Sequence, residues 1–199
     1  MACGGPSNSR WICIMFDEFP AEQAYRILES GPILLVSTRG TDGSANLMTM
    51  GFHMMISHDP ALVGAIIGPW DYSHQALLES RECVLAVPTV DLAEKVVDIG
   101  NCSGETLDKF ERFGLTPVAA KTVNAPLVGE CWANLECRIA DDGWSQRYNL
   151  LVLEVQRIWV DNTRQEKRLI HHKGDGRFSV DGEMIDLGER MVKWRYLMD

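Results

Sequence analysis

Short β-prone runs, separated by turn residues, dominate the hydrophobic pattern of this chain. Six of them predict strands, and they cover residues 33–38, 45–50, 62–67, 83–87, 135–140 and 150–160. Asp42-Gly43 lies between the first two runs, and Asp141-Asp142-Gly143 lies between the last two. Both turns are typical of β-hairpins, so the pattern predicts antiparallel pairing of the strands on either side.

Helical spacing appears in four short segments, which cover residues 20–30, 73–81, 92–99 and 106–113. Asp91 followed by Glu94 predicts a capping box for the third helix, and Gly114 predicts the end of the fourth. A weaker strand pattern covers residues 178–185, within a polar and turn-rich C-terminal segment.

The order of these elements predicts the fold class. Helices do not alternate regularly with strands, which argues against a doubly wound parallel sheet. We predict a mainly β fold with peripheral helices, built on a six-stranded antiparallel barrel that is closed or partly closed, because closure protects the sheet edges. The expected organisation is a flexible tail over residues 1–10, one domain over 11–168, and a C-terminal extension over 169–199 that packs on the barrel or on a partner subunit.

The net charge and the length of the apolar runs restrict the kinds of partner that the chain can bind. The chain of 199 residues carries 19 Lys and Arg against 28 Asp and Glu, a net charge of −9, which repels phosphate backbones and anionic lipid. No apolar run approaches the ~20 residues of a membrane span. We therefore expect neither a nucleic-acid nor a membrane partner, and the absence of a secretory pattern favours the cytoplasm.

The reactive side chains do not follow the common catalytic or metal-binding motifs. The sequence contains no GxSxG, HExxH, Walker or GxGxxG motif, and its five histidines lack metal-ligand spacing, so we expect no metal and no catalytic side chain. The six cysteines form no CxxC pair, which predicts reduced thiols. We expect Cys83 and Cys131 to lie in the core. Cys102 lies in a Gly-flanked segment and is the candidate for a reactive thiol.

A series of short motifs follows in a fixed order along the chain. They are Asp42-Gly43, Asn46-Leu47-Met48-Thr49, Asp59-Pro60, Tyr72-Ser73, Leu92-Ala93-Glu94, Ser103-Gly104, Asp108-Lys109-Phe110, Gly114-Leu115-Thr116, Ala125-Pro126-Leu127 and Asn134-Leu135-Glu136-Cys137. In this order they resemble the flavin reductase-like family, which includes the flavoredoxins, over about residues 31–160. The resemblance implies a split β-barrel that binds FMN noncovalently.

The same resemblance implies the cofactor site. It places FMN at Asn46, Met48, Thr49, Met50, Gly51, Phe52, Gly68, Trp70, Tyr72, Ser73, His74 and Ser103. Strand alternation sends Met48 and Met50 to one face and Thr49 to the other, and filling of the barrel is the alternative role for the methionines. Tyr72-Ser73 opens a predicted helix, where an anion is favoured, so the phosphate is expected there; simple N-capping by Ser73 is the alternative.

Two positions depart from the family pattern. Trp70-Asp71 stands where a basic residue is usual, and Ala86 stands where an Asn is usual. A carboxylate near a phosphate requires a neighbouring cation, for which His74, Arg81, a partner residue or the segment His171-His172-Lys173 are candidates. Trp70 is expected to cover the flavin ring or the ribityl chain.

The resemblance implies an oxidoreductase that passes hydride or electrons between a reduced donor, NAD(P)H, and an acceptor. The first alternative is a flavin-binding electron carrier that serves a protein partner without turnover of its own. The second is a scaffold that no longer binds FMN. We further expect a homodimer with the flavin near the subunit boundary, since split barrels of this family close against a second copy and Trp70 offers interface material.

Overall fold

The computed structural model describes Pro20 and residues 31–190. The predicted tail over residues 1–10, nearly all of the predicted helix over 20–30, and residues 191–199 lie outside this part of the chain.

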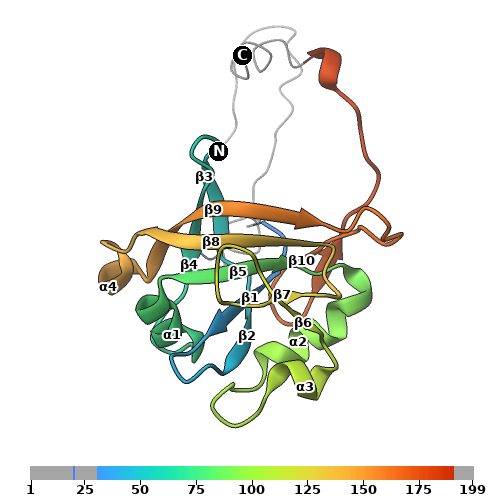
Figure 1. The fold of residues 1–199 in the computed structure, drawn as a ribbon. Coiled ribbons are helices and arrows are strands. Elements are labelled where there is room, and N and C mark those ends of the chain that lie inside the picture. Colours follow the sequence, from blue (N-terminus) through green and yellow to red (C-terminus); the bar gives the residue numbers. More distant parts are fainter. Residues whose placement is uncertain (1–19, 21–30, 191–199) are drawn as a thin grey trace, which may run out of the picture.

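One curled antiparallel sheet of seven strands forms the body of the protein, in the order β2-β1-β5-β8-β9-β4-β3 (Figure 1). In chain order these strands are β1 (Leu34–Arg39), β2 (Ala45–Met50), β3 (His53–Ser57), β4 (Leu62–Ile66), β5 (Glu82–Val87), β8 (Ala133–Asp141) and β9 (Leu150–Val160). All six predicted strands are present, both predicted hairpins pair antiparallel, and the mainly β split-barrel architecture is confirmed.

The seventh strand, β3, was missing from the sequence prediction. Its apolar residues Met54, Met55 and Ile56 are consecutive and all exposed, so the strand shows none of the alternation that identifies a half-buried strand. Only Gly51 and Phe52 separate it from β2, although the two strands occupy opposite edges of the sheet. This short link, whose Phe52 carbonyl accepts a hydrogen bond from Ile66 N at 3.0 Å, brings the two edges together and curls the sheet.

Apolar side chains pack on both faces of the sheet. The barrel interior holds Val36, Met48, Met50, Leu85 and Leu153, among others. Met48 and Met50 thus fill the barrel core, the alternative role considered for them, while alternation turns Thr49 to the outer face. On that outer face a second cluster joins β1 and β2 to the helices that follow β5.

The remaining elements are short and peripheral. They are α1 (Ser73–Ser80), η2 (Val90–Leu92), α2 (Ala93–Gly100), α3 (Lys109–Phe113), β6 (Pro117–Val118), β7 (Leu127–Val128), α4 (Ser145–Tyr148), β10 (Ile170–His172), β11 (Phe178–Val180) and η3 (Gly188–Arg190). Gly114 ends α3 at a φ of 58°, as predicted. The predicted capping box is wrong, because Asp91 instead accepts hydrogen bonds from Thr89 Oγ1 at 2.5 Å and from Arg164 at 2.6 Å.

The C-terminal segment returns to the barrel and then leaves it. Ile33 N donates to the carbonyl of Ile170 at 2.8 Å, which attaches β10 to the start of β1. The strand predicted over 178–185 stops at Val180, because Asp181 turns back to accept hydrogen bonds from Leu169 N and His171. Residues 181–190 then extend away from the body of the protein, all of them exposed (Figure 1). Among the described residues, no helix is long and apolar enough to cross a membrane.

Candidate functional site

Two depressions meet beside β2, at an edge of the sheet. The first, which we call the apolar groove, has a volume of about 630 Å³ and is mainly apolar. It is lined by Ile33, Thr49, Gly51, Phe52, Val96, Val97, Gly100, Asn101, His172, Gly174, Asp175, Gly176 and Phe178. The link between β2 and β3, the end of α2, and the β10–β11 hairpin therefore form its walls.

The second depression, which we call the Lys109 cavity, is smaller and more polar, with a volume of about 230 Å³. Its lining consists of Asn46, Met48, Thr49, Trp70, Asp71, Tyr72, Ile99, Gly100, Asn101, Cys102, Ser103 and Lys109. Thr49, Gly100 and Asn101 line both depressions, so the two adjoin each other beside β2.

Thr49 fixes the junction between the two depressions. Its Oγ1 donates a hydrogen bond to the carbonyl of Val96 at 2.6 Å, which joins β2 to α2. Gly100 lies against the same side chain, because a Cβ there would stand 3.4 Å from Thr49 Cβ. A single turn of α2 therefore contacts β2 closely, and the groove and the cavity share one floor.

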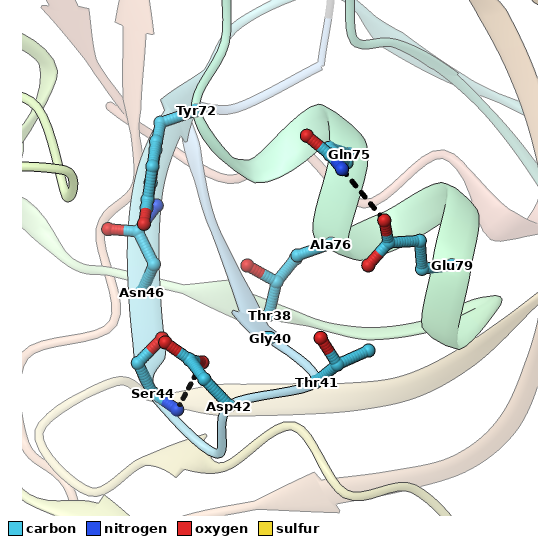
Figure 2. Close-up of a pocket in the computed structure, with 10 residues that line it drawn as sticks. All are labelled: Thr38, Gly40, Thr41, Asp42, Ser44, Asn46, Tyr72, Gln75, Ala76 and Glu79. Carbon is cyan, nitrogen blue, oxygen red and sulfur yellow. Dashed lines mark hydrogen bonds between the residues drawn. The ribbon is translucent and has the colours of Figure 1, made fainter.

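A buried polar cluster supports the Lys109 cavity from below. Ser73, at the start of α1, is only 1% exposed, and its Oγ accepts hydrogen bonds from Asn46 Nδ2 at 2.8 Å and Thr38 Oγ1 at 3.2 Å. The Ser73 hydroxyl is therefore directed into the protein and is not among the lining groups of the cavity. It positions Asn46, whose amide lies beside the Tyr72 ring in Figure 2.

The amide oxygen of Asn46 is buried and accepts no hydrogen bond from any residue that the structure describes. It faces Gly104, where an added Cβ would stand 2.1 Å from Oδ1 and 2.9 Å from Tyr72 Cδ1. A buried acceptor without a donor costs free energy unless a ligand or water supplies one. Asn46 lines the Lys109 cavity, and a hydroxyl or N–H group of a ligand that reached its Oδ1 would satisfy this acceptor.

Lys109 supplies the positive charge of the cavity. Lys109 is 3% exposed, and its Nζ donates a hydrogen bond to the carbonyl of Ile99 at 2.9 Å. Further N–H donors of the ammonium group remain for a ligand. Burial lowers the pKa of Lys109, while nearby Cys102 and Asp71 act in the opposite direction. An anion in the cavity would therefore meet a partly desolvated ammonium group, where a charge-assisted hydrogen bond is strongest.

Asp71 and Trp70 form the rim on the α1 side. Asp71 Oδ2 accepts a hydrogen bond from Gly68 N at 3.0 Å, so this carboxylate closes the turn that precedes α1. The Trp70 ring packs over Gly68, where a Cβ would come within 2.4 to 2.6 Å of three ring atoms. Trp70 lines the Lys109 cavity and is not among the residues of the apolar groove.

A third hollow lies on the other side of Asn46 and Tyr72, between β1, β2 and α1 (Figure 2). Its lining includes the hydroxyl groups of Thr38, Thr41 and Ser44 together with Asp42 and Glu79. The two carboxylates disfavour an anion. A phosphate would therefore find its favourable place in the Lys109 cavity and not in this hollow.

The structure brings together most of the residues named from the sequence. Those that line the groove or the cavity are Asn46, Met48, Thr49, Gly51, Phe52, Trp70, Tyr72 and Ser103. Of the others, Met50 lies in the barrel core, Gly68 supports Trp70, Ser73 is buried beneath Asn46, and His74 faces a neighbouring hollow beside α1.

Sequence reasoning missed Lys109 as the cation of the site, although its motif had been noted. Of the proposed cations, Arg81 lies at the other end of α1, where it donates to Asp142 at 2.8 Å. His172 lines the apolar groove, as one of the expected alternatives from the C-terminal segment. The signal that could have identified Lys109 is a lysine placed between a Gly-flanked loop and a short helix in a chain of net negative charge.

Cys83 and Cys131 lie in the core, as predicted. Neighbouring Cys137 and burial raise the pKa of Cys83, and burial raises the pKa of Cys131 to about 12, so both are inert core thiols. Cys102 lines the Lys109 cavity. Within residues 31–190, no group of three or more His, Cys, Asp or Glu side chains could hold a metal ion.

These features define the ligand that the site can take. The groove offers apolar walls, Asn46 offers a buried acceptor, and Lys109 offers a cation. A molecule with a flat apolar ring, a hydroxyl-bearing chain and an anionic end matches each of these groups.

Comparison with known proteins identifies the family. The sequence model of the flavin reductase like domain matches residues 28–178. An uncharacterized protein of Archaeoglobus fulgidus is 37% identical over 113 residues, which is 57% of this chain and 64% of that protein. The chain thus spans less than two thirds of the length of this relative.

Solved structures show the same fold. Flavoredoxin of Desulfovibrio vulgaris (Miyazaki F) superposes with a TM-score of 0.73 at 22% identity, covering 81% of this chain and 92% of that one. An FMN-binding domain of a flavin reductases-like enzyme from Shewanella baltica OS155 gives a TM-score of 0.73 at 24% identity, covering 84% and 95%.

Proposed function

The chain belongs to the flavin reductase-like family, and from this membership we propose that it binds FMN noncovalently along β2 and acts as a flavin-dependent oxidoreductase. The observation that carries the proposal is that the apolar groove and the Lys109 cavity adjoin at Thr49. In this proposal the groove takes the ring system and the cavity takes the polar tail.

Each part of FMN has a fitting group in the site. The walls of the groove, including Phe52 and Phe178, would hold the ring. The unpartnered Asn46 Oδ1 would accept a hydrogen bond from a ribityl hydroxyl, and the Lys109 ammonium would pair with the phosphate. When bound, FMN supplies the hydride and electron chemistry, while these residues bind and orient it.

The exposure of the groove supports a proposal for the electron donor and the acceptor. Phe52 is 57% exposed at its rim, so one side of a ring held there would stay open to a second reactant. We propose NAD(P)H as the reduced donor. The same open apolar rim also favours the alternative, a flavoredoxin-type carrier that passes electrons to a protein partner without small-molecule turnover.

A titration of the apo-protein with FMN tests the proposal. We expect the purified full-length chain to be yellow, to release flavin on heating or in acid, and to regain it from added FMN. Oxidation of NADH or NADPH by the FMN-loaded protein would then separate the enzyme from the carrier. A colourless protein that cannot be reconstituted with FMN would contradict the proposed function.

The proposal also covers the cellular compartment and the oligomeric state. The four described cysteines are free, which fits a reducing compartment, and we place the protein in the cytoplasm. We also propose a homodimer in which a second copy covers β3 and residues 181–190. Met54 and Met55 on β3 and Met184 and Ile185 beyond β11 are all exposed, and such apolar surface is typical of an interface.

A further inference from the structure

Trp70 is an exposed aromatic ring at the mouth of the Lys109 cavity. One face packs over Gly68, where a Cβ would come within 2.4 to 2.6 Å of the ring, and yet the Trp70 residue is 70% exposed. The outer part of the indole is therefore open to solvent beside the cavity that it lines. Tyr72, also exposed, lies on the same rim.

The neighbouring charges determine which ring can stack there. Lys109 lines the same cavity and is the positive group among its charged lining residues. The carboxylate of Asp71 is directed to Gly68 N, which reduces its availability to a ligand. A flat base next to a phosphate matches an open indole next to an ammonium, since aromatic side chains stack on bases whatever their edge pattern.

We propose that Trp70 is a stacking platform for the adenine of a second nucleotide unit, so that this site takes an adenine dinucleotide and not FMN alone. The inference rests on the proposed function, because it assumes a flavin phosphate at Lys109. It deepens that function by adding an AMP-like half, which belongs either to FAD or to the nicotinamide dinucleotide that reduces the flavin.

Trp70 is placed for this role and not for contact with the flavin ring. It lines the cavity that contains Lys109 but is absent from the apolar groove on the other side of Thr49. A pyrophosphate at Lys109 would direct its second nucleotide outward, across the rim on which Trp70 and Tyr72 lie.

The experiment compares wild type with Trp70→Leu, using apo-protein of the full chain. Affinities for FMN and FAD are measured by flavin fluorescence, and the affinity for 5′-AMP is measured by isothermal titration calorimetry, which does not depend on Trp70 as a reporter. The affinity for NAD⁺, which cannot reduce flavin, is measured in the same way on the FMN-loaded protein. Stacking of one base changes affinity by about 5- to 150-fold. Trp70→Leu should reduce the affinity for 5′-AMP by that factor, which should exceed any loss in the affinity for FMN, because the adenine and not the flavin stacks on the indole.

Two further variants serve as controls. Trp70→Phe retains a ring and should restore most of the affinity for 5′-AMP. Trp144→Leu removes another exposed tryptophan, which stacks on Tyr148 in α4 away from the site, and should change none of these affinities. Because Trp70 is largely exposed, the Leu variant should fold, and its far-ultraviolet circular dichroism checks this.

The measurements with FAD and NAD⁺ identify which dinucleotide supplies the adenine. A fall in the affinity for FAD relative to FMN in Trp70→Leu supports FAD, and a fall in the affinity for NAD⁺ supports the nicotinamide dinucleotide. Unchanged affinities for 5′-AMP, FAD and NAD⁺ in a variant that binds FMN normally would overturn the inference and leave the proposed function intact. Failure of wild type to bind FMN contradicts the proposed function, and the 5′-AMP result then still decides whether Trp70 stacks a base.

Discussion

Asn46 Nδ2 donates a hydrogen bond to Ser73 Oγ at 2.8 Å, across 27 positions of sequence. This bond ties the strand that carries the site to the first residue of α1. Because Ser73 also accepts from Thr38 on β1, one buried hydroxyl holds two strands and a helix in register. The position of the unpartnered Asn46 Oδ1, and therefore the polar end of the site, depends on this contact.

We expect Ser73→Ala to lower the free energy of unfolding by about 1–3 kcal/mol, because it leaves the Asn46 and Thr38 donors buried without an acceptor. Urea unfolding followed by tryptophan fluorescence measures the loss. Thr106→Ala removes an exposed hydroxyl as the control and should cost less than about 0.5 kcal/mol. Equal stability of both variants would show that the buried contact contributes little.

Lys109→Met should weaken the binding of FMN by about tenfold or more, because a charge-assisted hydrogen bond contributes about 1.5–3 kcal/mol. Riboflavin, which lacks the phosphate, should bind to the variant within about twofold of wild type. Lys121→Met removes an exposed lysine and should leave both ligands unaffected. An equal loss for FMN and riboflavin would place the phosphate elsewhere.

The affinity for FMN should also fall at alkaline pH. Burial lowers the pKa of Lys109 below its usual value of 10.5, although Cys102 and Asp71 oppose this. In the window between the lowered and the usual pKa, the unfolded chain binds more protons than the folded one, so the stability of the apo-protein rises with pH there. FMN binding needs the ammonium and should weaken over the same window, whereas riboflavin titrations should show no such dependence.

The sequence predicted the parts of the fold that local patterns determine. Asp42-Gly43 gave the β1–β2 hairpin, and Gly114 gave the end of α3. β3 lacked alternation because its consecutive apolar residues are exposed and none of them packs in the barrel core. Lys109 was missed as a site residue because only the packing of α3 against α2 brings its ammonium to the Ile99 carbonyl.

Thr49→Val should weaken FMN and riboflavin by the same factor, of about two- to tenfold. The valine keeps the shape but removes the donor to the Val96 carbonyl, which joins β2 to α2 at the floor shared by the two depressions. Both ligands have the ring that this floor supports, so the ratio of their affinities should stay that of wild type. A selective loss of FMN would instead link Thr49 to the phosphate.

Light scattering of the FMN-loaded protein should give a mass of about 45 kDa, as expected for two chains of 22.3 kDa. The reason lies in residues 181–190, which leave the body of the protein with Met184 93% and Ile185 74% exposed. In a monomer these apolar side chains would stay in contact with water and contribute no free energy of burial. A second copy would bury them.

Ile185→Glu should therefore shift the mass toward 22.3 kDa and lower the affinity for FMN, if the partner helps to enclose the groove. Glu183→Gln, on the same segment, changes a side chain without adding charge to the apolar surface and should preserve the dimer. A wild-type protein that is a stable monomer and retains full affinity for FMN would refute the shared interface. In that case the exposed residues of β3 and of segment 181–190 would instead be available to a redox partner of another kind.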